Sequence, residues 1–305
     1  MATTTSSSDT KNSAPKNSAP ARSLLDRTDS NRDALRTVAL PHAVTAGLAF
    51  LVVVTVVVGL LSNWLIGLLI GAVAGGVAAF VALRQVPNGS RAKIDAAIPS
   101  RPAPEDEFPR YHNLIEGLTL NSGAKRPELR VVDDPSLNLA VYGSPDDGVV
   151  VATTGLLHTL ERIELEGVLA AALVRLRAHD AELGMQLAAI RSFGLLDVRA
   201  DDDGLASKER AAASLANVLH AKLGEQREFL GDLGAVDITR YPPGLGGALM
   251  KMETVGTTVA SATVGTAHLW LADPLGTHRE GVGAALEPFR PQAPMSQRIM
   301  LMEEL

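Results

Sequence analysis

The side chains that could bind a metal ion or attack a substrate set narrow limits on the chemistry of this sequence. The chain has seven histidines and no cysteine, so a metal site would use imidazole and carboxylate ligands. No two histidines are four residues apart, and neither a GxSxG nucleophile motif nor a GxxxxGK phosphate loop occurs. His179 directly precedes Asp180, and Glu228 lies four residues before Asp232. These side chains could form a metal site only if distant segments converge.

Two long uncharged segments account for most of the excess hydrophobicity. No residue from 43 to 61 or from 65 to 83 is charged, and Ser62, Asn63 and Trp64 separate the two runs. At about 1.5 Å per residue each run spans about 28 Å, close to the hydrocarbon thickness of a bilayer. The pattern predicts a transmembrane helical hairpin whose first partner is the lipid bilayer.

Basic residues flank these two runs, whereas the turn between them is uncharged. Because cations concentrate at the cytoplasmic ends of spans, we expect two spans in the plasma (inner) membrane with both termini in the cytoplasm. The formal net charge of −6 argues against nucleic acid as a partner. The flanking cations are Arg27, Arg32 and Arg36 before the first run and Arg84, Arg91 and Lys93 after the second.

Small residues recur on one face of the second run. Gly67, Gly71 and Gly75 have four-residue spacing, which creates a groove that another helix backbone could approach closely. Two interpretations stay open. The groove could pack against the first helix of the same hairpin, or it could form a homo-oligomer contact in a structural subunit of a larger membrane assembly.

Composition divides the chain into four parts with an α+β fold in the last of them. Residues 1–38 are rich in Ser, Thr, Ala, Asn and Pro and predict a disordered tail. The hairpin covers 39–84, a Pro-rich linker 85–109, and a domain of ordinary size 110–305. Periodicity in that domain predicts helices at 111–122, 163–188, 208–241 with a break near Gly224 or Gly231, and 295–305, and strands at 129–133 and 149–153.

Several motifs in residues 111–305 resemble the HtpX-type membrane zinc metallopeptidases, gluzincins related to the CaaX prenyl endopeptidases. The resemblance implies a mostly helical, zincin-like cytoplasmic domain with a small sheet. Its edge strand would include Asn138, Leu139 and Ala140 and could bind an extended peptide. The matching segments are 127–133 with 138–140 and Gly143, 153–157 with 160 and 164–170, 227–232, 242–251, 268–270 with Pro274, and Phe289, Pro294, Arg298 and Ile299.

The catalytic positions depart from the family pattern. The resemblance places the two histidines and the general base of HExxH at Ala171, Arg175 and Ala172, which supply neither ligand nor base. Glu228 remains at the position of the third ligand, and Asp232 follows one turn later. Because catalytic zinc needs three protein ligands and a water, we expect zinc to be lost and no other cofactor to replace it.

Arg175 brings a fixed positive charge to the position where the metal's charge would lie. We expect its guanidinium to pair with Glu228 and tie two helices together. In the alternative interpretation Arg175 points to solvent, and Glu228 pairs locally with Arg227 or Lys222.

These observations predict a membrane-anchored, catalytically inactive metallopeptidase homologue. Such a pseudoprotease would act as a regulatory subunit, binding an unidentified protein or peptide through the old cleft or its edge strand. The alternative is an active membrane-bound zinc metalloendopeptidase with an atypical site, supported only by the family resemblance.

Overall fold

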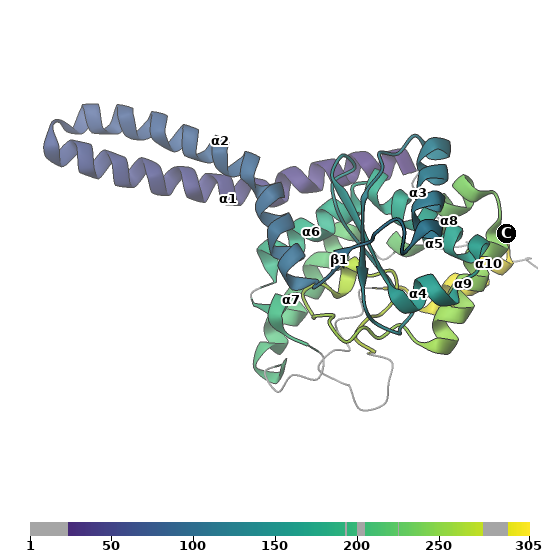
Figure 1. The fold of residues 1–305 in the computed structure, drawn as a ribbon. Coiled ribbons are helices and arrows are strands. Elements are labelled where there is room, and N and C mark those ends of the chain that lie inside the picture. The colour runs from purple at the N-terminus through teal and green to yellow at the C-terminus, as the bar shows by residue number, and fades with distance from the viewer. Residues whose placement is uncertain (1–23, 193, 200–204, 225, 277–291) are drawn as a thin grey trace, which may run out of the picture.

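The computed structural model describes residues 24–192, 194–199, 205–224, 226–276 and 292–305. A two-helix hairpin projects from a mostly helical domain that contains a four-stranded sheet (Figure 1). Residues 1–23, which belong to the predicted tail, lie outside the described part.

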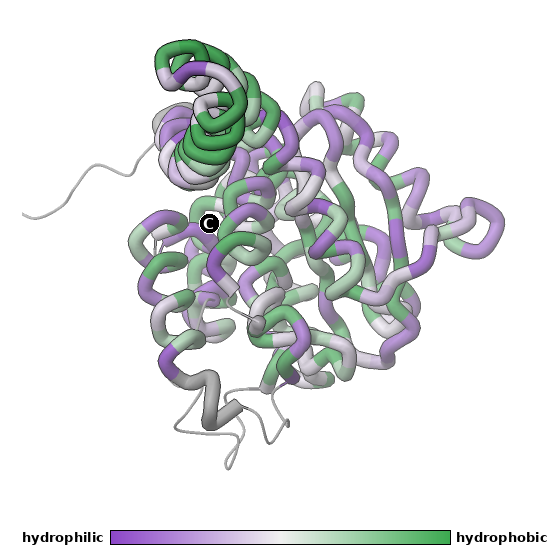
Figure 2. The backbone as a smooth tube through the Cα atoms, turned by 90° about the vertical axis from the view of Figure 1, so that its left-hand side faces the viewer, coloured by the Kyte–Doolittle hydropathy of each residue, from purple (hydrophilic) through white to green (hydrophobic). Residues whose placement is uncertain are grey.

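The hairpin consists of α1 (Leu24–Leu61) and α2 (Trp64–Ala97). Asn63 caps α2, because its side chain accepts a hydrogen bond from the Leu65 N–H at 2.8 Å. Both helices are long and apolar enough to cross a membrane. Figure 2 shows their projecting part as predominantly hydrophobic, which is what a lipid-facing surface requires and what the sequence predicts.

The glycine stripe of α2 packs against α1 of the same hairpin. A Cβ added at Gly71 would lie 2.2 Å from the Thr55 hydroxyl, and one at Gly67 would lie 2.7 Å from the Thr55 carbonyl oxygen. A Cβ at Gly75 would lie 2.7 Å from the carbonyl oxygen of Gly47. Only glycine permits this close approach of two backbones, so the first interpretation of the stripe describes the structure.

Both helices continue beyond the apolar runs into the domain, and we call these extensions (24–42 and 84–97) the stalk. Val38 and Ile94 are buried in the domain core, as is Ile98 directly after α2. Residues 24–38 and 85–97, predicted as tail and linker, are therefore helical. The burial of these apolar side chains offsets the conformational entropy lost by ordering the stalk.

The sheet has strand order β1-β2-β4-β3 and mixed direction. β2 and β4 are parallel, whereas β1 with β2 and β3 with β4 are antiparallel. Every residue of β3 and β4 is buried, because one hydrophobic core lies on each face of the sheet. This explains their continuous apolar sequence. The strands are β1 (Arg101–Pro102), β2 (Glu128–Val132), β3 (Leu139–Gly143) and β4 (Gly148–Thr153).

The helix predicted at 163–188 is two helices, because the chain bends at His179, which has φ 58°. The break makes Asp180 the first residue of a new helix, and its carboxylate pairs with the stalk. The break predicted near residue 224 or 231 occurs at Gly224, with φ 79°. The domain helices are α3 (Pro109–Ser122), α4 (Thr154–Thr159), α5 (Arg162–Arg177), α6 (Asp180–Arg191), α7 (Leu205–Leu223), α8 (Arg227–Thr239), α9 (Pro242–Val255) and α10 (Met295–Glu303), with 3-10 turns η1 (Leu195–Asp197) and η2 (Ala267–Leu269).

Candidate functional site

Helix α5 carries the three positions at which the family resemblance places the catalytic motif. A capping box between Glu161 and Glu164 defines the start of this helix. Its remaining turns run through the domain core, so Ala171, Ala172 and Arg175 are all buried. Two of these positions therefore present methyl groups to the interior, and the third presents a guanidinium.

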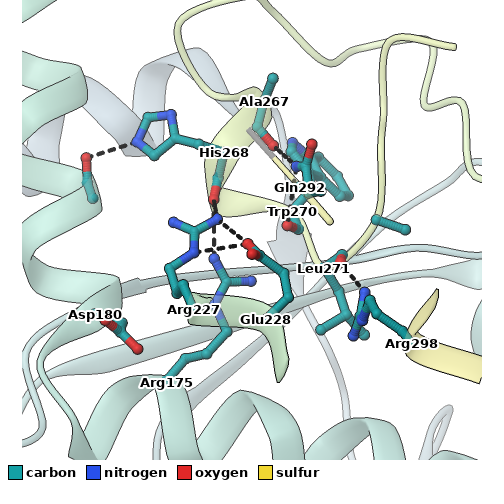
Figure 3. Close-up of polar contacts among 12 residues, drawn as sticks. Arg175, Asp180, Arg227, Glu228, Ala267, His268, Trp270, Leu271, Gln292 and Arg298 are labelled. Atoms are coloured by element: carbon teal, nitrogen blue, oxygen red, sulfur yellow. Dashed lines mark hydrogen bonds and ion pairs between the residues drawn. The ribbon is translucent and has the colours of Figure 1, made fainter. Parts of the chain in front are cut away.

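Two guanidiniums converge on one backbone carbonyl (Figure 3). The Nη2 atoms of Arg175 and Arg227 each donate a hydrogen bond of 3.0 Å to the carbonyl oxygen of His268. Arg227 also pairs with Glu228, with Nη2 2.6 Å from Oε1. Glu228 therefore forms its ion pair with Arg227, and the expected direct pair with Arg175 is replaced by the shared carbonyl. The alternative interpretation was right about Arg227, but its solvent-exposed Arg175 is contradicted by the burial of that side chain.

Burial and neighbouring charges shift the pKa values of Arg175 and Glu228. Burial, and next the neighbouring charge of Arg227, lower the pKa of Arg175 to about 9, so Arg175 stays charged at neutral pH. Burial alone would raise the pKa of Glu228, but attraction to Arg227 and then to Arg175 outweighs it and lowers that pKa. Among the described residues, Nε of Arg175 has no hydrogen-bond partner. Arg175 is thus a buried cation whose strongest attraction is to Glu228, a carboxylate that pairs directly with Arg227.

Asp232 belongs to a second buried ion pair. Arg298 on α10 holds its carboxylate through two hydrogen bonds of 2.7 Å, and also donates to the Leu271 carbonyl oxygen at 2.8 Å. Burial would lower the pKa of Arg298, but attraction to Asp232 outweighs it and raises that pKa. The Asp232 carboxylate is therefore fully engaged in joining α8 to α10.

The segment 267–271 is fastened at its carbonyl oxygens by side chains from three helices and from the residue Gln292. Arg175 and Arg227 hold the His268 carbonyl, and Arg298 holds that of Leu271. Gln292, which stands where the family resemblance implies a histidine, donates to the Ala267 carbonyl at 2.6 Å (Figure 3). Cationic and amide donors thus gather around one short stretch of backbone.

His268 itself is a structural residue. Its Nε2 lies 2.9 Å from the Gly184 carbonyl oxygen, which the ring can approach only as a donor. Burial lowers its pKa to about 3, so the ring is neutral at physiological pH. A neutral, enclosed imidazole bonded to a carbonyl positions η2 against α6.

The predicted peptide-binding edge is covered by the chain itself. Asn138, Leu139 and Ala140 are completely buried. The Leu271 N–H donates to the Leu139 carbonyl oxygen at 2.8 Å, and Ala140 forms an antiparallel bridge with Trp270. The predicted peptide-binding role of these three residues therefore finds no exposed strand edge in this structure.

His179 and Asp180 serve to dock the stalk. The Asp180 carboxylate accepts from Arg27 Nη2 at 2.7 Å and from Asn31 Nδ2 at 2.8 Å, in a buried contact. His179 Nδ1 bonds to Glu182 at 2.7 Å. Sequence reasoning assigned residues 27 and 31 to the tail and missed this contact, because nothing local in the sequence points to a partner some 150 residues away.

The residues at these positions do not fit a zinc ion. Ala171 and Ala172 have no donor atom, and the Arg175 charge would repel a cation. Across the part of the chain that the structure describes, no three His, Asp or Glu side chains form a group that could hold a metal. His179, His268 and Asp232 already have the partners given above.

Known proteins provide an independent comparison. The chain is 35% identical to the "Protease HtpX homolog" of Dictyoglomus thermophilum over 219 residues, covering 66% of this chain and 71% of that protein. The protein of the same name from Dictyoglomus turgidum is 35% identical over 214 residues, covering 64% of this chain and 68% of that protein. The Tropheryma whipplei (strain TW08/27) protein of that name is 29% identical over 225 residues, covering 68% and 76%. No protein-family model and no solved structure matches the chain.

These relatives confirm the likeness first drawn from residues 127–133, 153–170 and 227–232. Identity of 35% over about two thirds of both chains is too extensive to come from a few short motifs. Together with the two apolar helices, it identifies a membrane-associated protein. The chain belongs to the HtpX family of membrane proteases.

Proposed function

We propose that this protein is a membrane-anchored HtpX family member that has lost its zinc centre and no longer hydrolyses peptides. It acts as a non-catalytic, regulatory subunit at the cytoplasmic face of the plasma membrane, where it binds a protein partner. The two apolar helices of the hairpin support the anchoring. The family membership supports the protease ancestry.

One observation carries the loss of catalysis. Ala171 and Ala172 replace a ligand and the general base, and Arg175 replaces the second ligand on a buried helix face. Without a base and two ligands, Glu228 alone cannot hold zinc or activate a water molecule. The Glu228 carboxylate is instead neutralised by Arg227 at 2.6 Å.

The surroundings of the former site support a structural role for what remains. The segment 267–271, which covers the edge strand, is held by hydrogen bonds from the side chains of Arg175, Arg227, Arg298 and Gln292. A protein partner would therefore not pair with the edge strand, in contrast to the edge-strand binding expected from the sequence.

The test measures metal content and proteolysis on the full-length protein purified in detergent without added zinc or chelator. Elemental mass spectrometry should find far less than one zinc per folded chain, and casein should remain intact. The matched comparison is the triple variant Ala171→His, Ala172→Glu, Arg175→His, which restores the HExxH pattern beside Glu228. We expect this variant to bind about one zinc per chain.

Stoichiometric zinc in the wild-type protein, or casein cleavage that a chelator abolishes, would refute the proposal and favour an atypical active site. A folded triple variant that binds no zinc would show that the cluster is rearranged more deeply than three substitutions.

A further inference from the structure

The glycine contacts define how the two apolar helices are aligned. Gly75 approaches Gly47, and Gly67 approaches Thr55 and Gly59. Continued along both antiparallel helices, this register places Arg84 on α2 at about the level of Leu40 on α1. Leu40 is 55% exposed, and the continuous apolar surface of both helices ends here. This level is therefore the boundary between the apolar part of the hairpin and the stalk.

Three cationic side chains from three different helices meet this boundary. Arg84 is exposed and stacks over the Phe80 ring, 5.0 Å from its centroid. Arg36, one turn before Leu40, has a side chain that is 82% exposed. Lys222, in the last turn of α7, lies 3.3 Å from the Thr37 hydroxyl through Nζ. The end of α7 is thereby held beside the stalk at the level of the boundary.

The neighbouring carboxylates lie farther from the apolar surface. Asp33 pairs with Arg36 at 3.3 Å and lies almost one turn farther along the stalk. Arg91, two turns beyond Arg84, is engaged by three carboxylates of its own, those of Asp95, Glu128 and Asp147. The layer next to the apolar surface is thus cationic, and the next layer is mixed. This order of charge matches the anionic headgroups of a cytoplasmic leaflet.

We propose that Arg36, Arg84 and Lys222 bind the headgroups of anionic phospholipids, and that α7 is a third element in contact with the membrane surface. The inference rests on the membrane anchoring of the proposed function. Lys222 and Arg84 have flexible apolar stems that lie along neighbouring surface while their charged ends reach the headgroups. Each such cation favours an anionic over a zwitterionic lipid by about fivefold.

The experiment uses the full-length protein in vesicles made of equal parts phosphatidylcholine and phosphatidylglycerol. After extraction in mild detergent, mass spectrometry measures the ratio of the two lipids that stay with the protein. We expect phosphatidylglycerol to be enriched, and the double variant Arg84→Gln, Lys222→Gln to reduce the enrichment by at least fivefold. The control is Lys125→Gln, Arg162→Gln, which removes two exposed cations that belong neither to the hairpin helices nor to α7. It should leave the ratio unchanged.

A wild-type protein without enrichment, or an equal loss in the control, would overturn the inference. If the double variant melts at a lower temperature than the wild type, a salt series on the wild-type protein, from about 0.05 M to about 0.5 M, takes the place of the variant. An enrichment of phosphatidylglycerol that salt does not reduce would contradict an electrostatic contact. Flotation of the vesicles separates the two proposals. Protein that floats but shows no lipid preference refutes only this inference, whereas protein that does not float refutes the membrane anchoring.

Discussion

Arg175→Met is the substitution that most directly tests how the buried cluster of Arg175, Arg227 and Glu228 is stabilised. Methionine keeps most of the length of the side chain and removes its charge and donors. The Arg227–Glu228 pair stays intact, and the His268 carbonyl keeps the hydrogen bond from Arg227. No buried polar group is therefore left without a partner by this change.

The expected magnitude follows from two opposing contributions. Burial, and next the charge of Arg227, lower the pKa of Arg175 from its ordinary value to about 9, which corresponds to a penalty of roughly 5 kcal/mol on burying the charged form. Loss of its hydrogen bond to the carbonyl costs about 1.5–3 kcal/mol. Because relief of the buried charge outweighs this loss, we expect Arg175→Met to raise the free energy of unfolding by about 2–3 kcal/mol.

Thermal unfolding of the full-length protein in detergent, followed by circular dichroism, measures the effect. The expected rise in Tm is about 4–12 °C. Arg177→Met is the control, because Arg177 is exposed near the end of the same helix and should shift stability by no more than about 0.5 kcal/mol. A loss of more than about 2 kcal/mol in Arg175→Met would refute this reasoning and show that Arg175 is a net structural tie, as first expected from the sequence.

Three further predictions concern the hairpin, the stalk and the dependence on pH. Gly71→Ala should destabilise the hairpin, because its Cβ would lie 2.2 Å from a hydroxyl, whereas Gly76→Ala meets nothing within 4 Å and should be neutral; protease resistance in detergent compares them. Arg27→Met leaves the Asp180 carboxylate buried without its ion pair, so the denaturant midpoint should reveal a loss of about 3–5 kcal/mol, and an unchanged midpoint would contradict the docking of the stalk. His268 titrates near pH 6.5 when unfolded and near pH 3 when folded, so the folded state binds fewer protons in this window. The free energy of unfolding should fall by up to about 1.4 kcal/mol per pH unit as the pH decreases between these two pKa values, and His268→Gln should reduce that slope.

The elements that the sequence predicts correctly are those with a local signal. The hairpin follows from two uncharged runs, because a bilayer-length apolar segment needs no distant contact to be recognised. The strands at 129–133 and 149–153 follow from short apolar, β-branched runs with polar or glycine boundaries. The absence of an HExxH motif at residues 171–175 can likewise be read from residue type, and the inactivity inferred from it stays a prediction.

What the sequence could not predict depends on partners far along the chain. Residues 24–38 have the composition of a tail, but Arg27 and Asn31 donate hydrogen bonds to the Asp180 carboxylate, and the segment is a helix docked on the domain. The break at His179, directly before Asp180, has no glycine or proline to mark it.

Arg175 shows most clearly which features follow from the sequence and which depend on the tertiary structure. Its sequence position determined that a cation stands where the family resemblance implies a zinc ligand. Only the tertiary structure decided that Glu228 pairs with Arg227, that both arginines share the His268 carbonyl, and that the segment 267–271 covers the edge strand. The physical reason is that charge and hydrophobicity are properties of single residues, whereas the partner of a buried charge depends on which groups packing brings within a few ångströms.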